Sequence, residues 1–238
     1  MAESAKSRLI MRGLYAIVDL GLLEGRRIDP ITFVQAVLLA RPAAVQVRAK
    51  QAASRDILSL LRALAPMCRA VSAPLVANDR PDLAILAGCD MVHVGQSDIP
   101  IDQVRRLAPG IGIGVSTHTP EQLDAAVAAR PTYVAYGPVF ETSTKKDPDP
   151  VVGIAGLREA HTRAARAGVP LVAIGGITRD RASALVGIAD AVAVVGELLP
   201  PAPAFGHRFA SEWLGEVTAR ASALGNLFTS GPSRAGTA

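Results

Sequence analysis

The stretch IGIGVSTHTPEQLDAAVAARPTYVAY, residues 111–136, decides the fold. It begins with a short apolar run at 111–115, continues as an alanine-rich helical pattern at 120–129, and ends with a second apolar run at 133–136. Both runs are too short for helices and alternate little, which is typical of parallel strands buried on both faces. The stretch therefore predicts one strand–helix–strand unit of a parallel sheet.

The same unit repeats in both directions along the chain. Apolar runs predict eight strands at 14–18, 43–47, 74–77, 91–94, 111–115, 133–136, 171–174 and 191–195. Helical patterns lie between and after them at 31–40, 55–70, 82–87, 101–107, 120–129, 157–167, 179–186 and 205–224. Eight repeats without a linker or a change in composition predict an α/β fold, a single (βα)8 TIM barrel.

The predicted barrel domain spans residues 13–224, after an N-terminal extension at 1–12. Residues 225–238 are rich in Gly, Ser and Pro, and we expect them to form a disordered, flexible tail. The alternative fold is an open doubly wound sheet. Such a sheet normally has a glycine-rich turn after its first strand, but here the turn reads DLGL at 19–22, without GxGxxG.

Composition excludes several classes of protein. The chain has 238 residues, of which 50% are hydrophobic and 19% charged, so it is globular and not intrinsically disordered. The formal charge is +4, but the arginines are spread along the chain, and we expect no nucleic-acid partner. The most apolar stretch, 188–205, contains two acidic residues and three prolines, which argues against a membrane span.

The N-terminus and the cysteines indicate where the protein works. Residues 1–12 lack the apolar segment of a secretory signal. Cys68 and Cys89 have neither CxxC nor metal-ligand spacing, which suits small buried residues in a reducing compartment. We therefore expect a cytoplasmic protein. The sequence leaves open whether it forms a homo-oligomer.

Polar residues and glycines follow almost every predicted strand, where a barrel of this kind places its chemistry. Strand two ends in QVRAK at 46–50, so that Gln46, Arg48 and Lys50 alternate onto one face. Three of the chain's four lysines lie at strand ends, although arginine supplies most of the positive charge elsewhere. Chance placement on exposed loops is the alternative, but this pattern suggests a need for a compact ammonium group.

Asp79 and Asp98 end neighbouring predicted strands, so their carboxylates can approach one ion. Two carboxylates with few other protein ligands suit Mg²⁺, which keeps several waters or substrate phosphates. Zinc is not expected, because the four histidines do not converge by spacing. The alternative role for either aspartate is to cap the N-terminus of the following helix.

A phosphate site is expected at strands seven and eight. Gly175-Gly176 and Val195-Gly196 follow these strands, where backbone N–H groups bind phosphate without needing a lysine. Tight turns alone would also explain the glycines. Together with the cationic, metal-capable groups of strands two, three, four and six, this makes two anion sites on one rim. Two separate phosphorylated substrates would explain both.

These residues, in this order, resemble the thiamine-phosphate synthase (thiamine-phosphate pyrophosphorylase) family from about Leu14 to Leu198. The matching segments read LYAIVD, VQVRAK, ANDRPDLA, VHVGQSD, GVSTHT, YGPVFETSTKK, VAIGGIT and AVAVVGEL. IGGI occurs in many phosphate-binding barrels, whereas NDR, GQxD and TxTK together at strand ends are much more specific.

The resemblance implies a transferase of thiamine biosynthesis. It would join 4-amino-2-methyl-5-hydroxymethylpyrimidine diphosphate to 4-methyl-5-hydroxyethylthiazole phosphate, releasing pyrophosphate with the help of Mg²⁺. By the same resemblance, Gln46, Arg48, Lys50 and Asn78 would hold the pyrimidine diphosphate, Asp79 and Asp98 the Mg²⁺, Ser116 and Lys145 the diphosphate, Thr142 and Thr144 the thiazole, and Gly176, Val195 and Gly196 its phosphate.

The chemistry agrees with that assignment. Charge accumulates on the departing pyrophosphate, and Mg²⁺ with cationic side chains stabilises it. The groups expected to act in catalysis are Arg48, Lys50, Ser116 and Lys145. The aminopyrimidine can support a benzylic-type cation, so a dissociative substitution needs orientation and exclusion of water, but neither a general base nor a covalent nucleophile.

Three positions depart from the family pattern. Ala49 replaces a common acidic residue, Glu141 a frequent proline, and Gly196 a frequent serine. The last change keeps the backbone N–H but removes a hydroxyl contact to phosphate, worth about 1 kcal/mol.

Three other functions remain open at this point. A thiazole tautomerase on the same barrel would use a histidine such as His118 for proton transfer, but it would not need the aspartate pair with Lys145. A non-catalytic sensor would bind thiazole or thiamine phosphate without turnover. A Schiff-base aldolase would use Lys50 or Lys145 and require no Mg²⁺.

Overall fold

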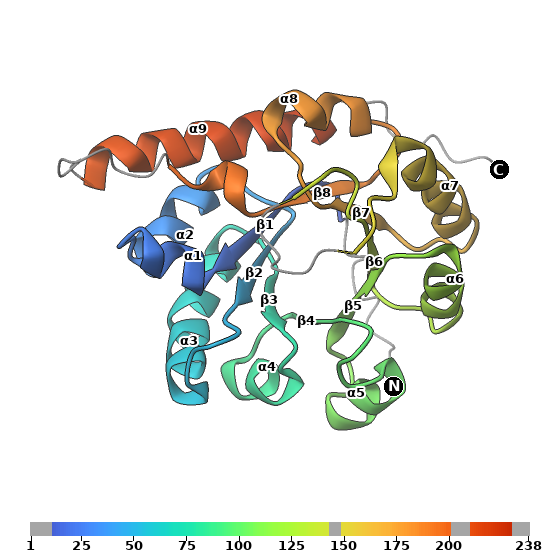
Figure 1. Ribbon diagram of the computed structural model, residues 1–238. Coiled ribbons are helices and arrows are strands. Elements are labelled where there is room, and N and C mark those ends of the chain that lie inside the picture. Colours follow the sequence, from blue (N-terminus) through green and yellow to red (C-terminus); the bar gives the residue numbers. More distant parts are fainter. Residues whose placement is uncertain (1–10, 143–148, 201–209, 230–238) are drawn as a thin grey trace.

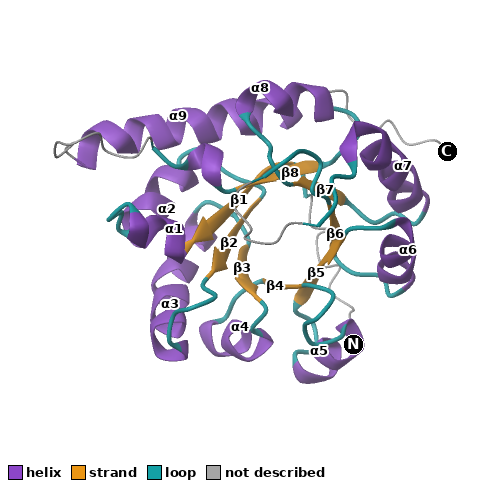
Figure 2. Cartoon of the chain, viewed as in Figure 1, coloured by secondary structure: helices purple, strands orange, loops and turns teal. Residues whose placement is uncertain are grey.

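The computed structural model describes residues 11–142, 149–200 and 210–229. Eight parallel strands close into one barrel in sequence order, with β1 paired to both β2 and β8 (Figure 2). The strands are β1 (Gly13–Asp19), β2 (Ala44–Arg48), β3 (Leu75–Asn78), β4 (Met91–Val94), β5 (Gly112–Thr117), β6 (Tyr133–Tyr136), β7 (Leu171–Ile174) and β8 (Ala191–Val194). The predicted (βα)8 barrel is confirmed, and the open sheet is wrong because β1 pairs with β8.

Helices surround the barrel and cover the outer faces of its strands (Figure 1). They are α1 (Leu20–Gly25), α2 (Pro30–Leu38), α3 (Ser54–Ala70), α4 (Pro81–Ala87), α5 (Ile101–Leu107), α6 (Pro120–Ala128), α7 (Gly153–Arg166), α8 (Arg179–Ala182) and α9 (Ala210–Thr229). Two short 3₁₀ helices follow α8 and β8, at Ser183–Leu185 and Gly196–Leu198. No helix in these described ranges is long and apolar enough to cross a membrane.

Apart from shifts in where predicted elements begin and end, two elements differ from the sequence prediction in kind. The short helix α1 was not expected; it begins after Asp19, whose carboxylate accepts a hydrogen bond from the Leu22 backbone N–H at 3.1 Å. The pattern at 179–186 forms one turn of α-helix followed by a 3₁₀ turn, rather than a single helix.

The core has two layers. The larger layer lies between the strands and the helices, and the smaller one fills the inside of the barrel. Tyr15 and Tyr133 are the largest side chains of the inner layer, and both are fully buried. The glycines of β5 make room for this layer, because a Cβ atom on Gly114 would lie 2.0 Å from the Tyr133 ring and one on Gly112 2.5 Å from Met91.

The last helix completes the wall around β1. Helix α9 packs against β1 and lies beside α2 and α8 (Figure 1). Leu224 and Phe228, one turn apart, are both buried, and the Phe228 carbonyl accepts a hydrogen bond from Arg12 Nε at 2.8 Å. The predicted start of the tail at residue 225 is therefore wrong, since α9 continues to Thr229. The rest of that tail, 230–238, lies outside the described residues.

Candidate functional site

The predicted site residues of strands β2 to β5 meet at the carboxyl ends of the strands. Gln46 lies within β2 and is buried, Arg48 ends β2, and Asn78 ends β3 in register with His93 of β4. Ser116 lies in β5 and is half-buried. Because all eight strands are parallel, their carboxyl ends form one rim, as expected from the sequence.

Two ion pairs hold the cationic side chains of strand β2. Arg48 forms an ion pair with Asp19, which ends the neighbouring strand β1, and Lys50 forms one with Asp79, which follows β3. The Lys50 side chain is 51% exposed, whereas that of Asp79 is 19% exposed. Asp19 was not among the site residues predicted from the sequence, although its position at a strand end was a usable signal.

Asp79 adopts an unusual backbone conformation for a residue other than glycine, with φ at 62°. Its backbone N–H donates to the His93 carbonyl at 2.8 Å, which fixes the turn after β3. Burial raises the pKa of the Asp79 carboxyl, the hydrogen bond from Lys50 opposes that rise, and Asp98 raises the pKa further. Asp79 and Asp98 are therefore close enough to interact, as their positions at neighbouring strands predicted.

Neither aspartate caps a helix. The N-cap of α4 is Arg80 and that of α5 is Pro100, and no side chain caps either helix. Asp98 instead accepts a hydrogen bond from the Gly95 backbone N–H at 2.7 Å, within its own loop. The capping alternative for Asp79 and Asp98 is therefore wrong.

This carboxylate pair fits a hard divalent cation. The described part of the chain contains no group of three or more His, Cys, Asp and Glu side chains that could hold a metal. Two carboxylates leave most coordination positions to water and substrate phosphate, which is how Mg²⁺ is usually bound beside a phosphorylated substrate.

Behind the rim, polar side chains are hydrogen-bonded inside the barrel. Tyr15 and Tyr133 bring their hydroxyl oxygens to 2.6 Å, and His93 contacts Tyr133 and Ser116 at 2.8 Å each. Burial lowers the pKa of His93 to about 4, so the ring is neutral at pH 7, and burial raises the pKa of both tyrosines. Tyr15 and Tyr133 were not predicted to belong to the site, because they lie within apolar strands rather than at strand ends.

The predicted phosphate cradle after β7 is shaped by close backbone contacts. Gly175 and Gly176 both have positive φ, at 99° and 62°. A Cβ atom on Gly176 would lie 2.3 Å from the Glu141 carbonyl oxygen, so only glycine fits against the loop after β6. A tight turn alone does not explain Gly176, because it also packs against Glu141, the residue that precedes Thr142.

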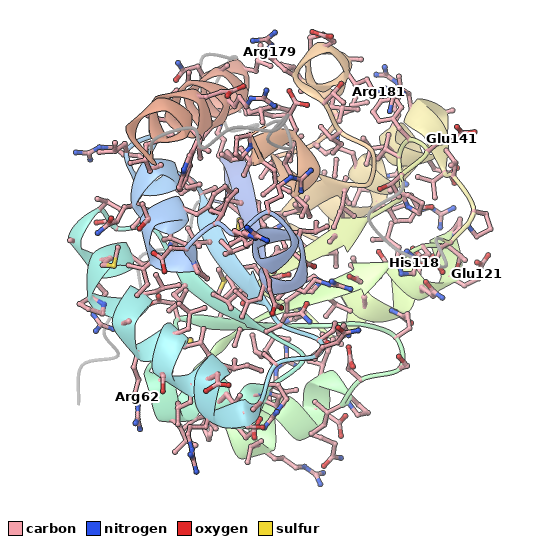
Figure 3. All side chains as sticks on the ribbon, turned by 60° about the vertical axis from the view of Figure 1, so that its left-hand side comes forward. Arg62, His118, Glu121, Glu141, Arg179 and Arg181 are labelled. Carbon is pink, nitrogen blue, oxygen red and sulfur yellow. The ribbon has the colours of Figure 1, made fainter. Side chains whose placement is uncertain are left out.

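Arg181 supports the same cradle from α8. Its guanidinium donates to the Gly176 carbonyl at 2.9 Å and lies 5.1 Å from the centre of the Phe140 ring. Figure 3 shows Arg181 on the same side of the molecule as Glu141. Arg181 could not be predicted from the sequence, because nothing in the pattern distinguishes it from the neighbouring Arg179 of the same helix.

Only some of the remaining predicted site residues lie in the described part of the chain. Val195 and Gly196 lie directly after β8, where Gly196 is exposed and has open space around its Cβ position. Thr142 is half-buried at the end of the described loop, and Thr144 and Lys145 lie outside the described residues.

His118 uses both ring nitrogens at the rim of β5. Nδ1 lies 2.6 Å from the Gly137 carbonyl, and Nε2 lies 3.5 Å from the Asp149 carboxylate. The ring is therefore engaged in structural contacts.

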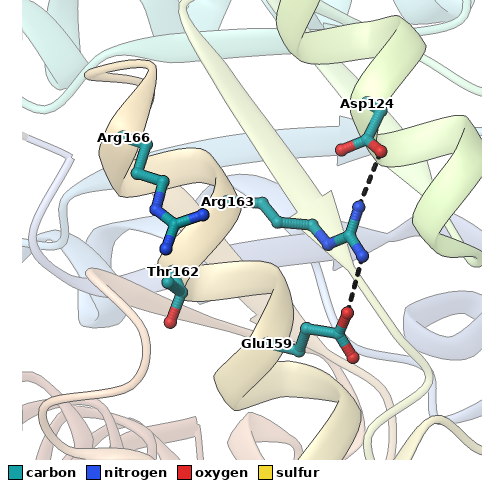
Figure 4. A pocket seen from close by; sticks show the side chains of 5 residues that line it. All are labelled: Asp124, Glu159, Thr162, Arg163 and Arg166. Carbon is teal, nitrogen blue, oxygen red and sulfur yellow. Dashed lines mark hydrogen bonds and ion pairs between the residues drawn. The ribbon is translucent and has the colours of Figure 1, made fainter.

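A separate surface pocket lies between α6 and α7, on the outside of the barrel. Arg163 spans it, bonded to Asp124 at 2.7 Å and to Glu159 at 2.6 Å (Figure 4). The pocket contains none of the predicted site residues, and its central guanidinium is neutralised by two carboxylates. It offers no chemistry comparable with that of the rim.

Comparisons with known proteins agree with this geometry. The family described as thiamine monophosphate synthase matches residues 14–198. A thiamine-phosphate synthase of Koribacter versatilis (strain Ellin345) is 41% identical over 201 residues, covering 81% of this chain and 92% of that protein. One of Methanoregula boonei is 44% identical over 158 residues, covering 66% of this chain and 72% of that protein.

A solved structure extends the similarity to three dimensions. Thiamine phosphate pyrophosphorylase from Pyrococcus furiosus superposes with a TM-score of 0.75 at 26% identity, covering 92% of this chain and 96% of that chain. The family match at 14–198 takes in the eight strands, except for the first residue of β1, and every predicted site residue.

Proposed function

This chain belongs to the thiamine monophosphate synthase family and is a transferase of thiamine biosynthesis, and we propose that the rim residues described above carry its reaction. The reaction joins a hydroxymethylpyrimidine diphosphate to a thiazole phosphate. The observation that supports this assignment most directly is the Asp79–Asp98 pair, which lies beside Lys50 on a rim that also has a glycine phosphate cradle.

The substitution proceeds without an acid or a base. The C–O bond between the pyrimidine methylene carbon and the diphosphate breaks, and its electron pair leaves with the diphosphate. The thiazole nitrogen then uses its lone pair to form the new C–N bond, so no proton is transferred. The products are thiamine phosphate and pyrophosphate.

Polar and charged groups that follow or end strands β2, β5 and β6 would bind the leaving diphosphate. Arg48, Lys50 and Ser116 stabilise the charge that develops on it, together with Lys145. Gln46, which is buried, and Asn78 would help to hold the pyrimidine diphosphate. Holding both reactants on one rim replaces an encounter in water with an oriented one.

Asp79 and Asp98 would hold Mg²⁺. When bound, the ion supplies positive charge that neutralises the diphosphate oxygens. The two carboxylates fit this role because one is held in a fixed turn by the His93 carbonyl and the other by the Gly95 N–H.

The thiazole phosphate would bind on the opposite part of the rim. Gly176, Val195 and Gly196 present backbone groups there, and Thr142 and Thr144 would position the ring. Gly176 can approach a phosphate closely because it has no side chain and its own carbonyl is held by Arg181.

The alternatives account for fewer of these features. A tautomerase would use His118 for proton transfer but would not need the Asp79–Asp98 pair beside Lys50. A Schiff-base aldolase would need a neutral lysine, whereas Lys50 forms an ion pair with Asp79. A phosphate sensor would have no use for a paired carboxylate site.

A mixing assay tests the proposal. The purified protein is incubated with both phosphorylated substrates and Mg²⁺, and pyrophosphate release and thiamine phosphate formation are followed with and without EDTA. Turnover that EDTA abolishes supports both the reaction and the metal. Binding of thiazole phosphate or thiamine phosphate without turnover would indicate the sensor, and isomerisation of the thiazole alone the tautomerase.

We also propose that the enzyme works in the cytoplasm on small-molecule substrates. Cys68 and Cys89 are both free thiols, as suits a reducing compartment. The absence of a nucleic-acid partner stays a prediction, which a DNA-binding assay would check. Light scattering would determine whether the protein forms a homo-oligomer, which the sequence leaves open.

A further inference from the structure

Four consecutive hydrogen bonds connect Gln46 with Ser116 through the inside of the barrel. Gln46 Nε2 donates to Tyr15 Oη at 2.8 Å, and Tyr15 Oη lies 2.6 Å from Tyr133 Oη. Tyr133 Oη lies 2.8 Å from His93 Nδ1, and His93 Nε2 lies 2.8 Å from Ser116 Oγ. We call these five side chains the interior chain. It contacts the site at both ends, because Gln46 and Ser116 are both assigned to the pyrimidine diphosphate.

The middle of the interior chain is sealed from solvent. Tyr15 is 1% exposed, Tyr133 0% and His93 7%. The His93 ring stacks on the Tyr133 ring, with centroids 5.7 Å apart and planes inclined by 19°. Buried polar groups without water must satisfy one another, so each hydroxyl and ring nitrogen here has a defined role as donor or acceptor.

The Gln46 amide, which donates at one end of the interior chain, determines which group donates in each of the following hydrogen bonds. The Tyr15 hydroxyl accepts a hydrogen bond from Gln46. It therefore donates its single O–H to the Tyr133 hydroxyl, its other partner among the described residues. Tyr133 then donates to Nδ1 of His93, so the ring accepts there and carries its proton on Nε2.

Ser116 is the last hydrogen-bond acceptor of the interior chain. His93 Nε2–H donates to Ser116 Oγ, so the serine hydroxyl accepts inside the barrel and keeps its own proton for a group on the rim. A hydroxyl that accepts one hydrogen bond becomes a stronger donor of the next.

We propose that His93 is a positioning residue that, backed by Tyr133 and Tyr15, holds Ser116 as a one-way hydrogen-bond donor toward the departing diphosphate. This inference rests on the proposed function, since it needs an anionic leaving group beside Ser116. The serine donor matters most in the transition state, because negative charge on the diphosphate grows as the C–O bond breaks. Binding of the thiazole phosphate does not depend on it.

A double-mutant cycle tests the coupling between His93 and Ser116. We expect His93→Leu to lower kcat about 10- to 100-fold, the range for losing an oriented donor to a developing anion, with the KM for thiazole phosphate unchanged. Ser116→Ala should lower kcat at least as much, and the double variant should be no slower than Ser116→Ala alone. His93→Gln should recover part of the loss, because its amide N–H can replace Nε2–H. Additive losses in the double variant would overturn the proposal.

Tyr133→Phe tests the direction of the chain with a small change. Without the Tyr133 hydroxyl, Nδ1 loses its donor and the ring no longer has a fixed tautomer, so kcat should fall while the fold persists. Tyr136→Phe is the matched control: it makes the same change on the same strand, but Tyr136 belongs to the outer layer of the core. Equal kcat values for the two variants would contradict the proposal.

A measurement without turnover separates this inference from the proposed function. Nitrogen-15 NMR of labelled histidine should show the His93 proton on Nε2 in the unmodified protein and a mixture of tautomers in Tyr133→Phe. A proton on Nδ1 in the unmodified protein would overturn the inference even if the enzyme is active. The expected tautomer in a protein that does not make thiamine phosphate would instead support the interior chain and refute the proposed function.

Discussion

The Lys50 ammonium donates a hydrogen bond to the Asp79 carboxylate, and the two residues come from the ends of neighbouring strands. The pair places a positive and a negative group where we expect a diphosphate and a cation to bind together. Each charge offsets the other, so neither is left unpaired at the rim. Substrate and metal together can then replace this contact by binding one partner each.

Asp79→Asn and Asp98→Asn should abolish Mg²⁺-dependent turnover. An amide is a poor ligand for Mg²⁺ compared with a carboxylate, and the loss of a metal that offsets leaving-group charge amounts to several kcal/mol. We expect at least a ~100-fold lower kcat/KM with little change in the melting temperature. Asp82→Asn is the control, since Asp82 pairs with Arg80 on the exposed surface of α4. Near-normal turnover in both site variants would refute the metal assignment.

Gly196→Ser should strengthen the binding of thiazole phosphate. The Cβ position of Gly196 has open space, so a serine fits there and its hydroxyl can donate to the phosphate. One such hydrogen bond is worth about 1 kcal/mol, which corresponds to about a fivefold lower KM for thiazole phosphate. Gly215→Ser, on α9, is the control and should leave KM unchanged. An unaltered KM in Gly196→Ser would place the phosphate elsewhere.

Arg181→Gln should raise the KM for thiazole phosphate more than that for the pyrimidine diphosphate. The change removes the bond to the Gly176 carbonyl and the contact with the Phe140 ring, which together hold the cradle against the loop after β6. Loss of about 1 kcal/mol predicts a KM about five times higher. Arg179→Gln is the control on the same helix. Equal effects on both substrates would mean that Arg181 acts only on overall stability.

Gly114→Ala should destabilise the barrel from inside. The added methyl group would lie 2.0 Å from the Tyr133 ring, which is fully buried and enclosed by other side chains of the inner layer. Overpacking of this kind lowers the free energy of unfolding by about 1–3 kcal/mol, measurable by urea denaturation. Gly156→Ala, in α7, makes the same change without a close contact and should be neutral or stabilising. A stable Gly114→Ala variant would show that the interior is less tightly packed than described.

The neutral state of His93 makes folding stability depend on pH. Its pKa is about 4 in the folded protein and about 6.5 when unfolded, so between these values the unfolded chain binds more protons. The contribution of His93 is therefore fully present above pH 6.5 and falls as the pH drops toward 4. We expect the free energy of unfolding to fall by about 2 kcal/mol more between pH 7 and pH 5 in the unmodified protein than in His93→Gln. Parallel pH curves for the two proteins would contradict this prediction.

Much of the fold could be predicted because parallel strands buried on both faces form continuous apolar runs. The run at 133–136 and the helix at 101–107 match the structure in both bounds. The end of α9 could not be predicted from composition, because Gly225 and Asn226 suggest a loop. Only the tertiary contacts of Leu224 and Phe228 show that the helix continues.

The rim of the site was predictable for a similar reason. Residues that follow parallel strands must lie at the same end of the barrel, whatever the details of packing. The interior chain was not predictable, because Tyr15 and Tyr133 lie on β1 and β6, which are not neighbours in the sheet. Their hydroxyls meet only because the barrel closes and Gly114 leaves room for a ring, and a linear pattern contains neither fact.

The closure of the barrel around β1 also constrains the order in which the protein can fold on the ribosome. Strand β1 is synthesised first, yet it pairs with β8, is covered by α9, and is joined to α9 by the bond from Arg12 to Phe228. Part of the apolar surface of β1 therefore stays uncovered until β8 and α9 have been translated. A nascent chain that stops before α9 leaves this surface of β1 exposed to solvent, and exposed apolar surface of this kind promotes aggregation.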